Sequence, residues 1–89
     1  RSTDILVRWG GDEFILLFPN TNLGDTTVIL ERIRIAIEKF VFTDSIRITC
    51  SFGAVEKKDI FDLDMMIRRA DSLMYSAKDM GGNRVQYDN

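Results

Sequence analysis

Residues 5–18 have the sequence ILVRWGGDEFILLF, in which a glycine pair separates two runs rich in β-branched, aromatic and other apolar residues. Glycine adopts the positive φ angles of tight turns whose twist matches that of paired strands. The pattern therefore predicts a β-hairpin with strands at residues 5–9 and 13–18. The unbroken apolar run at residues 14–18 further predicts burial of the second strand on both faces.

Two segments after the hairpin have a helical period. Asn22, with Asp25 three residues later, is typical of a helix start, and apolar residues then recur at helical spacing up to Phe40. A second helical pattern covers residues 63–77 and ends at Gly81 and Gly82. We expect the charged side chains of the first helix to lie on its solvent face, namely Glu31, Arg32, Arg34 and Glu38.

The remaining segments favour extended structure. Residues 46–54 alternate between apolar and polar side chains, which predicts a half-buried strand, and residues 84–87 predict a last short strand. The order strand, strand, helix, strand, helix, strand indicates an α+β fold in which helices pack against a sheet. Many functions use such a layer arrangement, so the residues at its turns and helix ends must distinguish them.

Composition excludes several classes of function. The chain has 89 residues and a net charge of −2, which argues against a broad basic surface for nucleic acid. It has no histidine and a single cysteine, Cys50, so we expect any metal ion to be held by oxygen. No apolar run approaches the length of a membrane span, and we expect a cytoplasmic location without direct membrane contact.

The hairpin turn is the strongest candidate for chemistry. Asp12 and Glu13 are adjacent carboxylates that directly follow Gly10 and Gly11. Glycines let a phosphate approach the backbone, and paired carboxylates can hold a divalent cation that neutralises nucleotide phosphates. The alternative is a surface hairpin with solvated charges at its tip.

Four segments in the same order resemble the GGDEF family of diguanylate cyclases. They are RWGGDEF at residues 8–14, ITCSFG at 48–53, RADSLMYSAK at 69–78 and GGNRV at 81–85. The resemblance implies the nucleotidyl-cyclase palm fold without its first strand and two helices, so that residues 1–89 form a single partial domain. It also implies that the parent protein condenses two GTP molecules into cyclic di-GMP and two pyrophosphates.

The resemblance assigns roles to individual residues. Gly10 and Gly11 would lie under the GTP phosphates, Asp12 would ligate Mg²⁺ or Mn²⁺, and Glu13 would serve the metal or a proton transfer. Lys78 would reach the phosphates from the end of the last helix; alternatively it only complements the helix dipole.

One position departs from the family pattern. Family members often have an arginine at the position of Gly82, so a second cationic contact is in doubt. We expect Arg84 to lie in the following strand rather than to replace it.

A second site is implied by Arg1 and Asp4, which precede the glycine pair at the spacing of the family's product-inhibition site. Arg32 corresponds to an arginine that completes this site from a neighbouring domain. Guanidinium and carboxylate groups can bind the phosphates and guanine edges of cyclic di-GMP. The alternative is an ordinary surface ion pair and a solvated arginine.

The missing half of the domain would supply another metal-binding aspartate and the residues that recognise guanine. The chain alone should therefore be inactive, whereas the parent would act as a homodimer, fused to an N-terminal sensor or receiver domain. Two alternatives stay open: a non-catalytic GGDEF domain that senses GTP or cyclic di-GMP, and a purely structural interaction domain.

Overall fold

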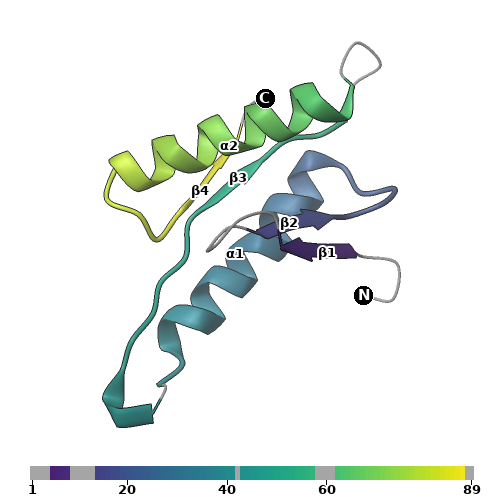
Figure 1. Ribbon diagram of the computed structural model, residues 1–89. Helices are drawn as coiled ribbons and strands as arrows, with labels where there is room; N and C mark the ends of the chain where they lie inside the picture. The colour runs from purple at the N-terminus through teal and green to yellow at the C-terminus, as the bar shows by residue number, and fades with distance from the viewer. Residues whose placement is uncertain (1–4, 9–13, 42, 58–61, 88–89) are drawn as a thin grey trace.

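The computed structural model describes residues 5–8, 14–41, 43–57 and 62–87, whose elements follow the order expected from the sequence (Figure 1). They are β1 (Ile5–Arg8), β2 (Phe14–Leu17), α1 (Leu23–Lys39), a 3₁₀ turn (Thr43–Ser45), β3 (Phe52–Ala54), α2 (Leu63–Asp79) and β4 (Val85–Tyr87). In this described part the strands form two separate two-stranded ladders, β1–β2 and β3–β4. The α+β class is confirmed.

The first ladder is the expected hairpin. Strands β1 and β2 are antiparallel, with Ile5 opposite Leu17 and Arg8 opposite Phe14. Phe14 is 59% exposed and the other residues of β2 are only half-buried. The expected burial of this strand on both faces is therefore wrong for the described structure, because all four residues of β2 line an open groove described below.

Helix α1 begins where the sequence predicts. Asn22 is its N-cap, and the Asn22 side chain accepts a hydrogen bond of 2.8 Å from the backbone N–H of Asp25. The next residue, Leu23, donates its backbone N–H to the carboxylate of Glu56, which lies in the segment after β3. Leu30 is the buried residue of the helix. Local capping and one long-range hydrogen bond thus fix the start of α1 together.

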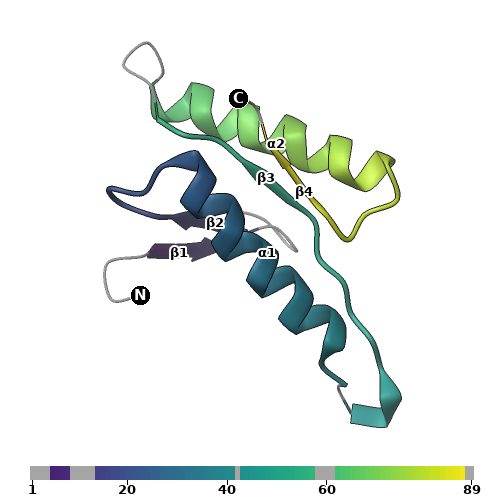
Figure 2. The same ribbon diagram turned by 180° about the vertical axis from the view of Figure 1, so that it is seen from behind.

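The second ladder lies against α2 and is also contacted by α1 (Figures 1 and 2). Strands β3 and β4 are parallel, with Phe52 opposite Val85. Ala54 in β3 and Leu73 and Ala77 in α2 are buried, so the compact part of the core lies between these two elements. Neither α1 nor α2, the two α-helices of the described ranges, is long and apolar enough to cross a membrane.

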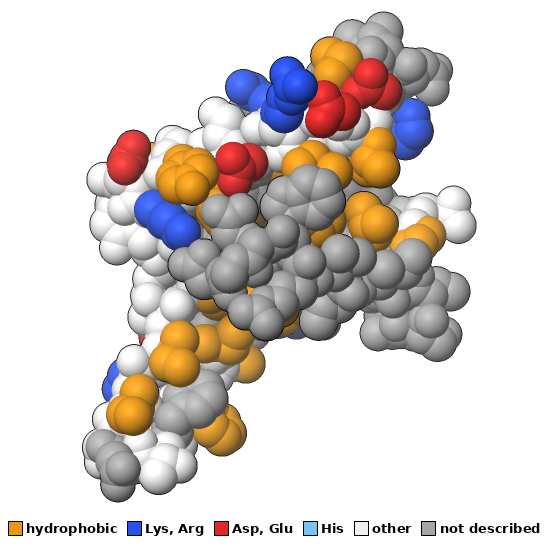
Figure 3. All heavy atoms as spheres, in the orientation of Figure 1, with side chains coloured by type: hydrophobic (Ala, Val, Ile, Leu, Met, Phe, Trp, Pro, Cys, Tyr) orange, Lys and Arg blue, Asp and Glu red, His pale blue; other side chains and the backbone are white. Residues whose placement is uncertain are grey.

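The third strand is shorter than its alternating pattern predicts. Only Phe52–Ala54 forms a ladder, and residues 46–51 have no strand partner within the described part of the chain. Ile46 is 53% and Ile48 is 45% exposed. Phe40 and Val41, just before the 3₁₀ turn, are also exposed, and apolar side chains gather on the surface at this end of the molecule (Figure 3). Alternation specifies which residues share a face, but a strand also needs a neighbour for its backbone hydrogen bonds.

Candidate functional site

The structure places β1 and β2 on either side of the signature, residues 10–14, whose last residue, Phe14, begins β2. Arg8 and Phe14 are paired across the hairpin, and residues 9–13 connect these paired ends. Gly10, Gly11, Asp12 and Glu13 lie outside the described residues, as do Arg1 and Asp4. Their roles therefore stay predictions.

Lys78 lies in the last turn of α2 and is exposed. Its Nζ is 5.4 Å from the centroid of the Tyr75 ring, which is within the range of a cation–π contact. Among the described residues no carboxylate forms an ion pair with Lys78. The ammonium group is thus a solvent-facing cation that can bind an anion arriving at this end of the helix.

The end of α2 is built by the two glycines that follow it. The N–H of Gly81 donates to the carbonyl of Lys78 at 3.1 Å, and the N–H of Gly82 donates to that of Ala77 at 2.9 Å. Gly81 and Gly82 have φ angles of +113° and +72°. This is the Schellman arrangement, in which residues beyond the helix satisfy its last carbonyls. The backbone of Lys78 is therefore bonded directly to the turn.

The geometry at Gly82 explains why a side chain is costly there. A β-carbon on Gly82 would lie 3.4 Å from Oγ of Ser51, so space is sufficient. The φ of +72° is in the left-handed region, which L-residues with a side chain rarely adopt. The obstacle to an arginine at this position is the backbone conformation, not a steric clash.

Arg84 lies closer to the glycine turn than we expected from the sequence. Strand β4 begins only at Val85, and Nε of Arg84 donates back to the carbonyl of Gly82 at 3.1 Å. The carbonyl of Arg84 accepts a hydrogen bond of 2.9 Å from the N–H of Phe52. The backbone of Arg84 therefore joins β3, while its guanidinium packs on the turn that carries Gly82.

The predicted position of Arg34 on the solvent face of the first helix is wrong. The Arg34 side chain is only 15% exposed, although the helical pattern put it on the solvent face. It donates to Oε1 of Glu31 at 2.9 Å and to Oδ1 of Asn83 at 3.0 Å, and Oε1 of Glu38 lies 3.9 Å away. With these hydrogen-bond and ion-pair partners, the guanidinium can be largely shielded from solvent. The hydrogen bond from Arg34 lowers the pKa of Glu31, and the same bond raises the pKa of Arg34.

Cys50 lies near this cluster and is half-buried. Burial raises the pKa of its thiol, and the positive charge of Arg34 offsets part of that effect. The thiol therefore stays protonated near neutral pH, as expected for a packed cysteine rather than a reactive one.

No group of three acidic or cysteine side chains that could hold a metal ion occurs within residues 5–8, 14–41, 43–57 and 62–87. The candidate ligands Asp12 and Glu13 lie outside these ranges. Their carboxylate oxygens are the donors that Mg²⁺ and Mn²⁺ prefer, so the donor chemistry fits such an ion.

Arg32 is the described member of the expected product-inhibition site. It is exposed on α1, whereas Arg34, two residues along the same helix, is largely buried. The two neighbouring arginines thus face different surroundings, and only Arg32 is presented to a molecule outside the chain.

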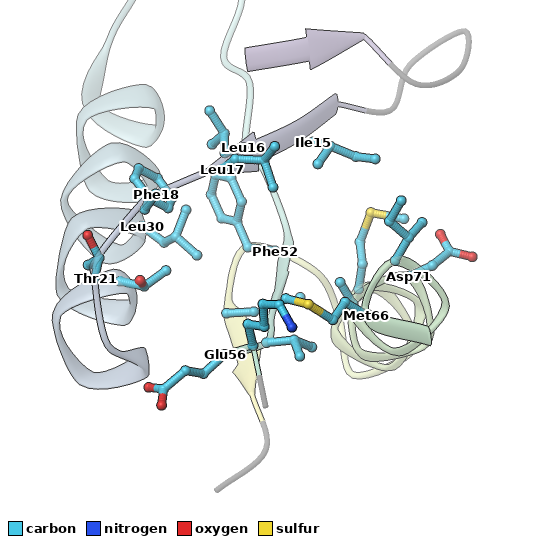
Figure 4. A pocket seen from close by; sticks show the side chains of 18 of the residues that line it. Ile15, Leu16, Leu17, Phe18, Thr21, Leu30, Phe52, Glu56, Met66 and Asp71 are labelled. Carbon is cyan, nitrogen blue, oxygen red and sulfur yellow. The ribbon is translucent and has the colours of Figure 1, made fainter. Parts of the chain in front are cut away.

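A groove of about 700 Å³ runs between β2 and α2, with β3 along it (Figure 4). Leu17, Phe18 and Leu30 line one side and Met66 lines the other, while Phe52 lies between them. Lys78 does not line this groove, and its walls are predominantly apolar. The lining includes three charged residues, Glu56, Lys57 and Asp71, and is otherwise mostly apolar, so the groove is mainly an uncovered apolar surface of the described chain.

Comparison with known sequences gives a consistent result. Residues 1–84 match the family model described as "Diguanylate cyclase, GGDEF domain". The chain is 36% identical to diguanylate cyclase DgcM of Escherichia coli K12 over 85 residues, which are 96% of this chain and 21% of that protein. It is 42% identical to diguanylate cyclase VdcA of Vibrio cholerae over 84 residues, which are 88% of this chain and 25% of that protein. The chain thus spans about a fifth to a quarter of these curated relatives.

Two solved structures share the fold. The active GGEEF domain of a diguanylate cyclase from Vibrio cholerae has a TM-score of 0.82 and 28% identity, over 97% of this chain and 56% of that one. The diguanylate cyclase SiaD of Pseudomonas aeruginosa, solved with its activator SiaC, has a TM-score of 0.87 and 33% identity, over 99% of this chain and 35% of that one. The motifs, the fold and the relatives agree, and the chain belongs to the GGDEF-domain family of diguanylate cyclases.

Proposed function

We propose that the protein containing this chain is a diguanylate cyclase, which converts two GTP molecules into cyclic di-GMP and two pyrophosphates. The observation that carries the proposal is an intact Gly-Gly-Asp-Glu-Phe signature on a hairpin with paired flanking strands, in a chain that shares the fold of an active GGEEF domain. In this reaction the 3′-hydroxyl of each GTP attacks the α-phosphorus of the other, and pyrophosphate leaves at each step.

The chain would contribute three groups to this chemistry. Gly10 and Gly11 let the phosphates approach the backbone at the hairpin turn. Asp12 and Glu13 would hold Mg²⁺ or Mn²⁺, which when bound neutralises charge on the phosphates and activates the attacking hydroxyl. Lys78 supplies a cation from the end of α2, where no carboxylate of the described ranges pairs with it.

We further propose that this chain is part of a larger catalytic domain. It covers 56% of the solved GGEEF domain, and its mostly apolar groove of about 700 Å³ is open between β2 and α2. The strand and two helices expected before residue 1 would cover this groove and supply the groups that recognise guanine. Without them the chain should not make product, and the complete protein should work as a cytoplasmic homodimer in which each protomer presents one GTP.

The test is the conversion of GTP by the parent protein with Mg²⁺, followed by chromatography. The wild type should form cyclic di-GMP, and Asp12→Asn should abolish it because the substitution removes charge with little change in volume. Asp64→Asn is the matched control, since Asp64 is 69% exposed and pairs only with Arg68 in the described structure. Full activity of Asp12→Asn would contradict the assignment of the metal site.

A second candidate function is a GGDEF domain that binds nucleotide without turnover. The observation that favours it is the left-handed backbone of Gly82, a position at which the family resemblance implies an arginine in many members. A wild-type parent that binds GTP or cyclic di-GMP but forms no product would establish this function and exclude the first.

A further inference from the structure

Asn83 joins three parts of the fold. Its Oδ1 accepts from Arg34 in α1 at 3.0 Å, its Nδ2 donates to Glu38 in α1, and its backbone N–H donates to Oγ of Ser51 at 3.0 Å. The partners lie 49, 45 and 32 residues away in the sequence. Every one of these hydrogen bonds is therefore a tertiary contact.

The backbone of Asn83 also adopts an uncommon conformation. Its φ is +52°, so Gly81, Gly82 and Asn83 form three consecutive residues with positive φ. Asparagine is among the few residues with a side chain that tolerate this region. The side-chain contacts of Asn83 stabilise a backbone conformation that most residues rarely adopt. The backbone N–H of the adjacent Gly82 donates to the carbonyl of Ala77 in α2.

These contacts connect α1 to the end of α2 that carries Lys78. Arg34 and Glu38 hold Asn83, Asn83 follows the glycine turn, and Gly81 in that turn donates to the carbonyl of Lys78. Arg34 is 15% exposed, so its hydrogen bonds are better shielded than those of the surface pair Arg68–Asp64, whose side chains are 79% and 69% exposed. The contacts of Arg34 link α1 to the turn that follows α2, whereas the Arg68–Asp64 pair lies within α2.

We propose that Arg34 and Asn83 are positioning residues of the nucleotide site: with Glu38 they hold the turn after α2 so that Lys78 is fixed where it meets the phosphates. The inference rests on the proposed function, since it takes GTP as the ligand of Lys78. Preorganised cations bind phosphate better than mobile ones because less conformational freedom is lost on binding.

The sharpest test reverses one hydrogen bond. Asn83→Asp keeps an acceptor for Arg34 but places a carboxylate against Glu38. The double variant Glu38→Gln/Asn83→Asp restores the bond with its direction reversed, because the new amide at position 38 then donates to the new carboxylate at position 83. The double variant also keeps the net charge of the wild type. Arg68→Met is the control for loss of a helical arginine away from the turn.

The readout is the KM for GTP, the kcat and amide hydrogen exchange at residues 81–84 of the parent protein. Asn83→Asp should raise KM about fivefold or more with little change in kcat, and should speed exchange about tenfold. The double variant should recover both quantities to within about twofold of the wild type, and Arg68→Met should change neither. Asn83→Gly serves if Asn83→Asp does not fold, since glycine tolerates the positive φ but lacks the side chain.

The outcomes separate this inference from the proposed function. If the wild type forms no product, calorimetry with GTP replaces KM, and the same pattern of loss and recovery is expected in affinity. Faster exchange with unchanged KM or affinity would show that the cluster only stabilises the fold, which overturns the proposal. Failure of the double variant to recover would overturn it as well.

Discussion

Gly53 in β3 lies so close to Ala70 in α2 that a β-carbon on Gly53 would be 2.0 Å from the Ala70 carbonyl oxygen. The same atom would be 2.6 Å from the backbone nitrogen of Met74. A real β-carbon essentially never lies within 3.0 Å of such an atom. The strand therefore packs directly on the helix backbone, and the absence of a side chain at Gly53 makes this possible.

Gly53→Ala should destabilise the parent domain by about 3 kcal/mol or more, because neither the helix backbone nor the paired strand can yield easily. Chemical denaturation measures the change. Gly24→Ala is the control: its β-carbon would meet only Oδ1 of Asn22 at 3.4 Å, and alanine in the first turn of α1 should be neutral or stabilising by about 0.5 kcal/mol. Equal stability of Gly53→Ala and the wild type would contradict the packing.

The features predicted correctly from the sequence are those with local causes. The hairpin follows from two apolar runs around glycines, the start of α1 from the capping side chain of Asn22, and the end of α2 from Gly81 and Gly82. Each depends on one short continuous stretch of the chain, which a sequence pattern displays directly.

The features predicted wrongly depend on distant residues. Residues 46–51 alternate like a strand but have no ladder partner among the described residues. Arg34 occupies a polar position of the helical pattern, yet its side chain is only 15% exposed, because Asn83, 49 residues away, completes its set of partners. The roles of Asp12, Glu13, Gly10 and Gly11 stay predictions from the family resemblance.

The start of α2 gives a prediction that does not depend on function. The side chain of Asp62 accepts a hydrogen bond of 2.8 Å from the N–H of Met65. Asp62→Ala should destabilise the parent domain by about 1 kcal/mol in thermal or chemical denaturation, while Asp62→Asn should retain most of the stability because it keeps the acceptor. Equal losses in both variants would show that charge, not the capping bond, stabilises this helix end.

The ion pair of Glu31 predicts a dependence of stability on pH. The hydrogen bond from Arg34 lowers the pKa of Glu31 in the folded protein below its ordinary value of 4.5. The folded state therefore favours the ionised carboxylate, and the stabilisation is present above about pH 4.5 and lost as the pH falls through the lower, folded value. The side chain is 46% exposed, so the effect is small.

Denaturation curves of the wild type and Glu31→Gln at several pH values measure this contribution. The difference in unfolding free energy between them should be constant at neutral pH and should shrink as the solution becomes more acidic than about pH 4.5. A difference that grows on acidification would mean that the folded protein favours the protonated acid, contrary to the observed hydrogen bond.

The product-inhibition site expected from the family resemblance gives a binding prediction for the parent protein. Arg1→Ala should weaken the binding of cyclic di-GMP by about thirtyfold, or ~2 kcal/mol, because a bidentate arginine contact to phosphate or guanine is lost. Arg32→Ala should weaken it by a smaller factor, since Arg32, which is exposed on α1, is expected to complete the site only from a neighbouring domain. Calorimetry measures both, and equal binding by wild type and Arg1→Ala would exclude the site.

Lys78 and Lys39 allow phosphate binding to be separated from helix stabilisation. Each lysine lies in the last turn of a 17-residue helix, so each complements the negative end of a helix dipole. Replacing either lysine by alanine should therefore cost a similar, small amount of stability, about 0.3–1 kcal/mol. Any difference between the two variants in nucleotide binding must then come from direct contact with the ligand.

In the parent protein, Lys78→Ala should weaken GTP binding by about 1–3 kcal/mol, the usual contribution of a hydrogen bond to a charged group. Lys39→Ala should leave the affinity unchanged. The loss in Lys78→Ala should also decrease at high salt, because added ions screen an exposed ammonium such as that of Lys78. If both variants bind GTP as the wild type does, Lys78 only caps its helix, and the phosphates are bound by other groups.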